Sequence, residues 1–484
     1  MGSSDCSQNH NTKPKAKGLT DRLYNGWNQL IVTGIVAFCC PGIFNAINSL
    51  GGAGSSNAQT ASFTNFCLYA TFAIFGYTAG AFFNMLGPRV LMSVGASTYV
   101  FYILMSYFAA MQNSWADVAF IISGAVLGWG AGWFWSAQGA LMLAYAPSGR
   151  KGFYISTFWV IFNLGGFIGG MMAFGVNFSN KNGTHLSSMS YFVFVGVMIA
   201  GTVFAVLGIR APSKVTREDG KPVLLLPQRG VREELVGVVK VITDRNMLLL
   251  FTLFFASNFF YTYVFAVNLK LFTIRTRGLN SALFWGAQMV FSVLFGRLVD
   301  HNGGGKVRST YSRAKAGFLF TAIVTIISWS MGVYLQYGYR GGFTRTGTVT
   351  KIDFASTEWI YPIITFILYG AADSLVQTFS YFIMSAIGGS DTQLCARYTG
   401  FYKGIQSLGA AVAWVLDSSY IQASYTIQLF ACIGLFMIGM SLAWIVVRNL
   451  RYAESQSETD VEYEVEDDSI RKVYCTPQQR AEQV

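Results

Sequence analysis

The feature that most constrains this chain is a succession of apolar stretches, each about 20 residues long and almost free of charged side chains. An α-helix of about 20 residues spans the hydrocarbon core of a bilayer, which is about 30 Å thick. Charged residues make up 12% of the chain, whereas soluble domains carry about 25%. We therefore expect an all-α protein that crosses the membrane many times.

We count twelve such stretches and expect each to form a transmembrane helix. The expected organisation is an N-terminal tail (1–26), a six-helix bundle (27–210), a polar central loop (211–244), a second six-helix bundle (245–450) and an acidic tail (451–484). Because the acidic tail is poor in apolar residues, we expect it to be disordered. The spans are centred near Val36, Ala73, Val100, Leu127, Val160, Val197, Phe255, Met289, Thr325, Tyr369, Ser407 and Phe436.

Basic residues are concentrated in alternate loops, including Arg150, Lys151 and the central loop. The positive-inside rule therefore predicts that both termini lie in the cytosol. The net charge of +11 follows this loop pattern, so we expect the lipid bilayer, and no nucleic acid, as the partner of the charged surface. Two glycosylation sequons, at Asn177 and Asn182, fall in one loop that the charge pattern places outside. The plasma membrane and the endomembranes both fit this topology.

A short motif closes the second and the eighth expected spans. Each copy has a glycine, a polar residue, a second glycine and then basic residues. Two further echoes follow in the same order: GAGWFWSAQ with GAADSLVQ, and RKGFYIS with RYTGFYKG. This common order indicates two six-helix halves related by an internal repeat, which is typical of transporters. The first copy consists of Gly80, Asn84, Gly87 and Arg89, and the second of Gly296, Asp300, Gly303, Lys306 and Arg308.

The motif resembles the signature loop of the major facilitator superfamily. Four longer stretches are similar to the Unc-93-like family of that superfamily, in the form that fungal and plant members take. They are PGIFNAINSLGG (41–52), GWGAGWFWSAQGALMLAY (128–145), GFYISTFWVIFNLGGFIGG (152–170) and DRNMLLLFTLFFASNFFYTYVFAVN (244–268). The resemblance implies the major facilitator fold, with twelve helices in two six-helix repeats. It also implies that Asn84 stands where the family has an acidic residue.

An acidic side chain in this motif can accept hydrogen bonds from basic residues and from the N-terminus of a neighbouring helix. Such a latch breaks and forms again as two bundles rock. Asp300 keeps the carboxylate, whereas the neutral amide of Asn84 bonds without charge assistance. Alternatively, the glycines of both copies serve only to set tight turns between helices.

Two charged residues are expected deep inside the membrane, where an unpaired charge is costly. Asp373 lies well within the tenth span, and Lys403 lies in the eleventh at a similar depth. We hypothesise that they form a buried pair facing the interior. The pair either fixes the packing of the two helices statically or takes part in proton- or substrate-linked movement.

Uncharged polar residues within the spans are candidates for the lining of a central cavity, although amides in bundles also bind neighbouring helices. These candidate cavity residues are Asn45, Asn48, Gln138, Asn163, Asn258, Tyr261, Gln288, Gln377, Tyr381 and Gln406.

Cysteine and histidine spacings show no metal site, and no cofactor motif is present, so we expect no cofactor, no metal and no enzymatic activity.

Two functions fit this pattern. A two-repeat bundle is typical of a secondary transporter that moves a small solute by alternating access. The family resemblance implies a second possibility, because animal members are associated with potassium-channel regulation or with the trafficking of membrane receptors. Asn84 favours such a nontransporting partner protein, whereas Asp300 and Asp373 favour a transporter.

Overall fold

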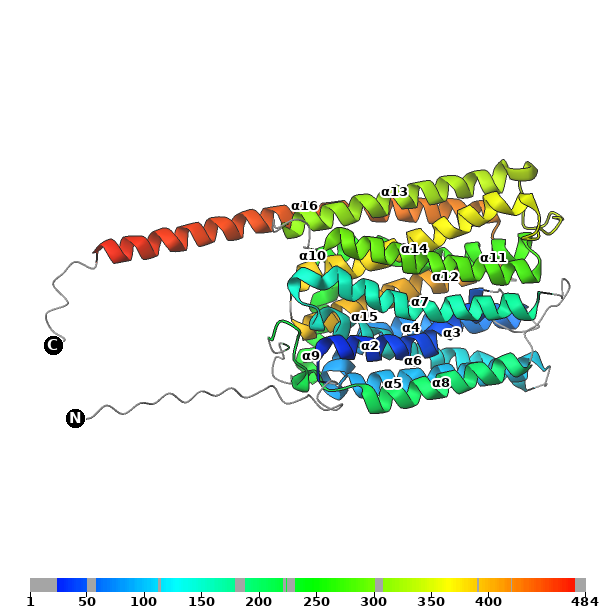
Figure 1. Cartoon of the computed structure of the whole chain (residues 1–484), viewed down its shortest axis with the longest axis horizontal. Helices are drawn as coiled ribbons and strands as arrows, with labels where there is room; N and C mark the ends of the chain where they lie inside the picture. The colour runs from blue at the N-terminus through cyan, green and yellow to red at the C-terminus, as the bar shows by residue number, and fades with distance from the viewer. Residues whose placement is uncertain are drawn as a thin grey trace, which may run out of the picture.

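A computed structural model of the chain describes residues 24–49, 58–111, 115–178, 188–220, 223, 231–300, 308–389, 391–418 and 420–474. Long helices run alongside one another in one bundle, and both ends of the described chain lie at the same end of it (Figure 1). The N-terminal half contains α2 (Gly26–Ala37), η1 (Phe38–Gly42), α3 (Ile43–Ser49), α4 (Ala58–Leu86), α5 (Pro88–Ala110), α6 (Ala116–Tyr145), η3 (Ser148–Arg150), α7 (Lys151–Val176) and α8 (Ser188–Gly208).

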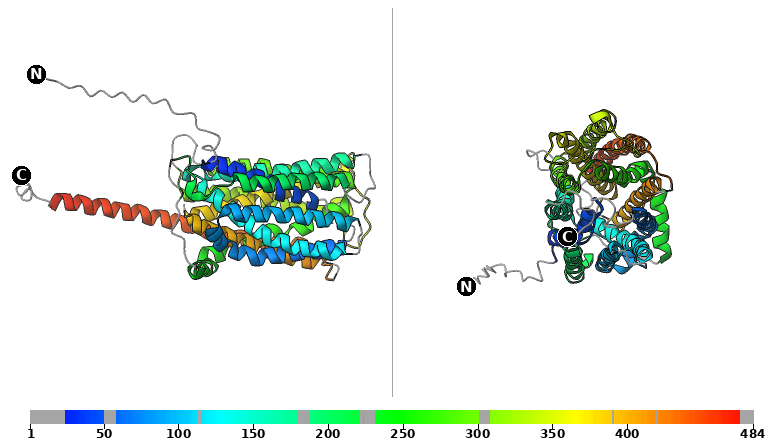
Figure 2. Two further views of the ribbon diagram at one scale, coloured as in Figure 1. Left: turned by 90° about the horizontal axis from the view of Figure 1, so that it is seen from below. Right: turned by 90° about the vertical axis from the view of Figure 1, so that its right-hand side faces the viewer.

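The central loop contributes η4 (Pro212–Lys214) and one amphipathic helix, α9 (Val231–Ile242). The C-terminal half contains α10 (Arg245–Phe259), α11 (Tyr261–Leu271), α12 (Ile274–Val299), α13 (Thr310–Tyr337), η5 (Tyr339–Gly341), η6 (Thr357–Trp359), α14 (Ile360–Gly388), α15 (Thr392–Asp417) and α16 (Tyr425–Tyr474). We call the end of the bundle that carries α9 the terminal face and the opposite end the distal face (Figures 1 and 2).

Every expected span centre falls in a helix. Within the described ranges, eleven helical segments are long and apolar enough to cross a membrane. The one expected span missing from these eleven is the eleventh along the chain, α15, which has 26 residues but carries many polar side chains. Most of α15 is buried against other helices. Its polar side chains therefore face protein, and the helix does not have to be as apolar as one that faces lipid.

The first span is interrupted near its middle. Phe38–Gly42 forms a π-helical turn that contains Pro41, because proline cannot donate a backbone hydrogen bond within the helix. The acidic segment differs from expectation. The backbone of α16 continues as a helix to Tyr474 (Figure 1), since a helix already formed by its apolar part extends at low cost through Glu and Arg.

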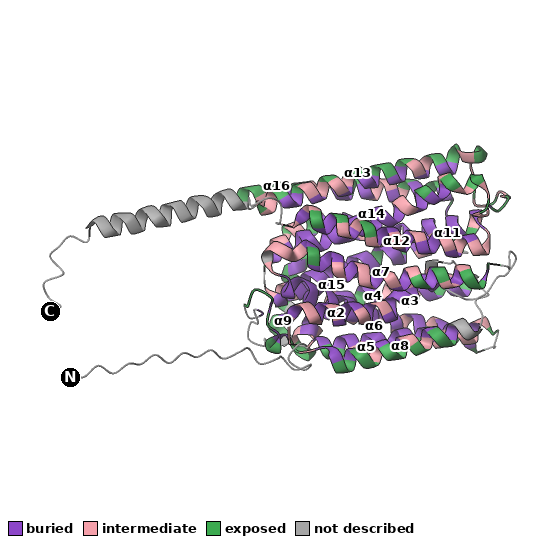
Figure 3. Ribbon diagram, in the orientation of Figure 1, coloured by how far each residue is buried: buried purple, intermediate pink, exposed green. Residues whose placement is uncertain are grey.

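Exposed residues lie along the outside of the bundle, whereas buried residues fill its interior (Figure 3). Ile199 and Leu207 on α8, Ile326 on α13 and Met437 on α16 all present exposed side chains. Exposed apolar side chains on several of these helices fit a surface that contacts lipid.

The two halves meet along two seams, where α7 packs on α12 and α4 packs on α15. The first glycine of each motif copy lies in one of these seams. A Cβ added to Gly80 would lie 2.8 Å from the Cα of Arg397, and one added to Gly296 would lie 2.7 Å from the carbonyl oxygen of Gly152. These glycines therefore permit close contact between the halves. Gly87 has a positive φ of 78° and forms the turn into α5.

Candidate functional site: a central polar cluster closed at the terminal face

The second copy of the motif joins the two halves at the terminal face. The Asp300 carboxylate accepts hydrogen bonds from the backbone N–H groups of Gly152 (2.7 Å) and Phe153 (2.6 Å), in the first turn of α7. Arg313 lies 3.8 Å from the same carboxylate. Burial raises the pKa of Asp300, and the two backbone bonds oppose that rise. We call these contacts the Asp300 latch.

Of the basic residues in that copy, the structure describes Arg308. Arg308 donates to the carbonyl of Leu298, while Gly303 and Lys306 lie outside the described residues. In the first copy, Arg89 donates to the carbonyl of Val206 on α8, so it contacts its own half.

The first copy of the motif is completed by a residue from α9. Asn84 Nδ2 donates to Glu234 Oε2 at 2.9 Å. The Glu234 carboxylate also pairs with Arg397 on α15, with Nη2 2.8 Å from each carboxylate oxygen. Glu234 is 1% exposed and Arg397 is 7% exposed. We call these contacts the Glu234 latch; the acid absent at position 84 is thus supplied by the central loop.

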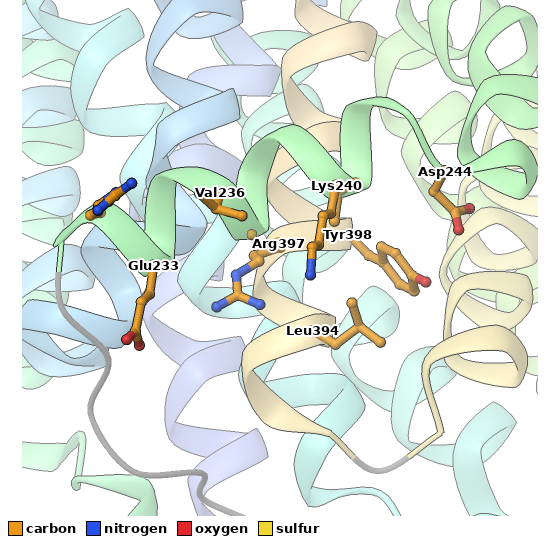
Figure 4. Close-up of a pocket in the computed structure, with 10 residues that line it drawn as sticks. Glu233, Val236, Lys240, Asp244, Leu394, Arg397 and Tyr398 are labelled. Carbon is orange, nitrogen blue, oxygen red and sulfur yellow. The ribbon is translucent and has the colours of Figure 1, made fainter.

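A pocket of about 590 Å³ lies beside this latch, between α9 and the beginning of α15. Lys240, Arg397 and Tyr398 point into the space beneath α9 (Figure 4). Asp391 caps the N-terminus of α15 by accepting from the backbone N–H groups of Gln393 and Leu394. α9 is therefore docked across the seam between α4 and α15.

A third contact at the terminal face joins α7 to α14. Lys151 Nζ donates to the carbonyl oxygens of Ser385 (2.9 Å) and Gly389 (3.1 Å). These carbonyls lie at the C-terminus of α14, where a cation is favoured by the unpaired backbone groups and the helix dipole. Lys151 thus links the N-terminal half to the C-terminal half near both latches.

The two intramembrane charges lie close together and are joined by an amide. Asp373 accepts hydrogen bonds from Tyr261 (2.6 Å), Gln288 (2.8 Å) and Gln377 (2.7 Å). The oxygen of the Gln377 side chain lies 3.4 Å from Lys403 Nζ. Between Asp373 and Lys403, both of which the structure describes, no ion pair shorter than 4.0 Å occurs. The hypothesised pair is therefore bridged through Gln377.

The Lys403 ammonium is surrounded by aromatic rings from both halves. Its Nζ lies 4.7 Å from the ring centroid of Trp135 on α6, 5.4 Å from that of Tyr381 and 4.8 Å from that of Tyr402. Gln406 accepts a hydrogen bond from Nζ at 2.7 Å. Trp135 belongs to the N-terminal half, so this cation contacts both halves of the bundle.

Two further bonds connect the halves around the charges. Trp159 Nε1 donates to the side-chain oxygen of Gln288 at 3.3 Å, and the Tyr381 hydroxyl donates to that of Gln138 at 3.3 Å. A rotation of one half relative to the other would break both bonds. The polar cluster therefore lies where the halves would separate.

A cavity of about 60 Å³ lies beside the cluster. Five of the ten candidate cavity residues line it, and Lys403 lines it as well. Among the other candidates, Asn163 donates to the carbonyl of Trp159 within α7, while Gln138, Gln288 and Tyr381 make the bonds given above. Asn48 is also absent from the lining. The five that line the cavity are Asn45, Asn258, Tyr261, Gln377 and Gln406.

The phenylalanine and tyrosine residues that line the cavity, and the acid of the first latch, are the parts that sequence reasoning missed. Tyr69, Phe72 and Tyr99 line the cavity, yet nothing distinguishes them in the sequence from aromatic residues that pack or face lipid. Glu234 stands in the segment expected only as a polar central loop, and its partners lie 150 and 163 residues away.

The structure describes the asparagine of one of the two sequons. The Asn177 side chain is 5% exposed, and its Nδ2 donates to the carbonyl of Ala173. Asn182 lies outside the described residues. Since a glycan would be attached at Nδ2, the glycosylation prediction now depends on Asn182.

Comparison with known proteins gives a family and a fold. The family model described as ion channel regulatory protein UNC-93 matches residues 56–441. UNC93-like protein 1 of Arabidopsis thaliana is 38% identical over 393 residues, covering 81% of this chain and 83% of the relative. An UNC93-like protein of Schizosaccharomyces pombe is 34% identical over 394 residues, covering 81% of this chain and 76% of that protein.

Solved structures of major facilitator superfamily transporters have the same fold. A bacterial homologue of the iron transporter ferroportin superposes with a TM-score of 0.60 at 11% identity, covering 88% of this chain and 100% of that one. The human organic anion transporter MFSD10 gives 0.55 at 16% identity, with the same coverage. These likenesses concern the fold alone. The chain is a multi-pass membrane protein of the major facilitator fold and belongs to the UNC-93 family.

Proposed function

We propose that this protein is a transporter that moves a small solute across the membrane by alternating access between its two halves. The observation that carries the proposal is the central polar cluster, in which Asp373 and Lys403 are buried at the interface of the halves beside a small cavity. Buried charges inside a membrane are costly and persist mostly where they serve function.

The latches give the proposal a mechanism. The Asp300 latch closes the seam between α7 and α12, and the Glu234 latch closes the seam between α4 and α15. Opening at the terminal face requires both sets of bonds to break, along with the contacts of Lys151. We propose that this face is cytosolic, as the distribution of basic residues indicates.

The distal face is less evenly closed. Arg275 donates to the carbonyl of Phe178 at 3.0 Å, so α12 and α7 stay in contact there. In contrast, an apolar groove of about 620 Å³ separates α4 from the distal part of α15, between Ala73 and Leu408. Loss of the bond from Arg275 to Phe178 would therefore expose the cavity at the distal face before it is exposed at the terminal face.

The experiment is a pair of spin-label distance measurements by pulsed EPR on the purified full chain. Labels at Val90 and Lys315 report the separation of the halves at the terminal face, and labels at Met111 and Tyr337 report it at the distal face. The unsubstituted chain measures the background labelling of its own cysteines. Alternating access predicts that Asp300→Asn combined with Glu234→Gln lengthens the terminal distance and shortens the distal one. Unchanged distances at both faces would contradict the mechanism.

A second function is supported by the description of the matching family, ion channel regulatory protein UNC-93. In that case the chain acts by binding another membrane protein, and the polar cluster only fixes the packing of the two halves. The same distance measurements separate the two proposals, because a rigid partner protein requires no exchange between inward- and outward-open states.

A further inference from the structure

We propose that the central cavity binds an organic anion, with its carboxylate at Lys403 and its apolar body against the aromatic wall. This inference rests on the proposed transport function and adds the chemical class of the solute. It follows from the placement of the two charges, from their hydrogen bonds and from the walls of the cavity.

The charge that faces the cavity is positive. Among the described residues that line it, Lys403 is the only one with a charged side chain, and Asp373 does not line it. Asp373 lies behind Tyr261 and Gln377, which both line the cavity and both donate to its carboxylate. The charged group available to a solute in the cavity is therefore the ammonium.

The hydrogen bonds show the same asymmetry. The Asp373 carboxylate already accepts three bonds between 2.6 and 2.8 Å from Tyr261, Gln288 and Gln377. The Lys403 ammonium has three donors, and among the described residues it has one close acceptor, Gln406 at 2.7 Å, with Gln377 at 3.4 Å. Its other neighbours are ring faces, which attract a cation less strongly than a carboxylate oxygen does. The ammonium retains the capacity to bind an anionic oxygen.

The walls indicate what the rest of the solute is like. Phe44, Phe72 and Phe162 line the cavity with Tyr69 and Tyr99, and aromatic rings of this kind favour a flat or aliphatic body. Asn258 also lines the cavity, and its side-chain oxygen is buried without a hydrogen-bond partner among the described residues. A buried amide oxygen without a partner is costly, so a donor on the solute would be favoured there.

The cavity is too small for an organic anion, so binding of the anion must be coupled to separation of the two halves. About 60 Å³ holds a few water molecules, whereas sites for organic ligands measure about 300–1,000 Å³. An organic anion therefore fits only after the halves separate around Trp135 and Lys403. Binding should be accompanied by a lengthened distal distance between the labels at Met111 and Tyr337.

The test is calorimetric titration of the purified full chain with matched probes. The probes are 3-phenylpropionate, its neutral amide 3-phenylpropionamide, the cation 3-phenylpropylamine, the smaller anions acetate and hexanoate, and sodium chloride. We expect the carboxylates to bind, with affinity rising from acetate to 3-phenylpropionate, and the amide to bind about tenfold or more weakly. Equal binding of acid and amide, preference for the amine, binding of chloride alone, or no binding of any carboxylate would overturn the inference.

Variants localise the binding. Lys403→Gln should abolish the preference for acid over amide, Lys403→Arg should retain part of it, and the exposed control Lys315→Gln should leave it unchanged. Retention of the full preference in Lys403→Gln would overturn the assignment to this residue. If Lys403→Gln fails to fold, the probe series on the unsubstituted chain still decides the chemical class. Carboxylate binding that lengthens the distal distance would sustain this inference even if the double variant Asp300→Asn with Glu234→Gln leaves both distances unchanged, a result that would reject the transport function.

Discussion

Removal of the Glu234 carboxylate would leave the Arg397 guanidinium buried without its anionic partner. The two side chains are 1% and 7% exposed, and both Nη2–oxygen distances are 2.8 Å. Breaking a buried pair by removing one member costs about 3–5 kcal/mol, because the remaining charge stays desolvated. Replacing both members by apolar residues of similar size is often nearly neutral. We therefore expect Glu234→Met and Arg397→Met each to destabilise the protein strongly, and the double variant to recover most of the loss.

The structure also sets an upper limit on that loss. If α9 undocks from the seam between α4 and α15, Arg397 becomes hydrated. The observed cost of Glu234→Met cannot exceed the free energy with which α9 is docked. Undocking would expose the central loop, so the single variants should be cleaved there more rapidly by a protease than the double variant.

The assay is thermal unfolding of the full chain in detergent, with limited proteolysis of the same samples. Glu233→Met is the matched control, because Glu233 lies beside Glu234 on α9 and is exposed; a change there should stay within about 0.5 kcal/mol. Single variants as stable as the unsubstituted chain would refute the reasoning. So would a double variant whose loss equals the sum of the single losses, since that result would mean that the two residues do not interact.

Three further predictions follow from other parts of the structure. Gly80→Val should lower the unfolding temperature and loosen the terminal face, since its Cβ would lie 2.8 Å from the α15 backbone; Gly175→Val, where the added Cβ meets nothing within 4 Å, is the control. Hydrogen bonding to Arg275 lowers the pKa of Asp353 to about 2. That acid therefore stabilises the fold above about pH 4, and its contribution should be lost between about pH 4 and 2; Asp353→Asn should remove this part of the pH dependence of unfolding. Any shift in gel mobility on enzymatic deglycosylation should disappear in Asn182→Gln alone, and its persistence there would contradict the buried position of Asn177.

The arrangement of the helices was largely predictable from the sequence, because bilayer thickness sets the length of apolar segment that crosses it. α15 is the instructive case. It is about as long as its neighbours, but its sequence is more polar than that of the eleven apolar spans. Its stability inside the membrane is explained by the helices that surround it. The acidic part of α16 was expected to be disordered from its composition, yet it continues the helix from its apolar part.

The candidate site was predictable where its residues share a helix. Asp373 and Gln377 are one helical turn apart, so their side chains fall on one face of α14. The contacts between halves were not predictable, because no local pattern relates Asn84 to Glu234, or Lys403 to Trp135. The role of each amide could not be predicted, because an asparagine in an apolar span can either bond its own helix or line a cavity. Asn163 bonds its own helix, whereas Asn258 lines the cavity.

The central claim is that the cavity communicates with each side of the membrane in turn. The most direct test uses the variant Asn258→Cys, reconstituted in vesicles in each of the two orientations and treated with a membrane-impermeant thiol reagent. The unsubstituted chain gives the background labelling of the protein's own cysteines. The account predicts labelling from both sides, and loss of labelling from the terminal side alone when α9 is cross-linked to α15. Labelling from one side only, or from neither, would contradict alternating access and favour a protein that acts through a membrane partner.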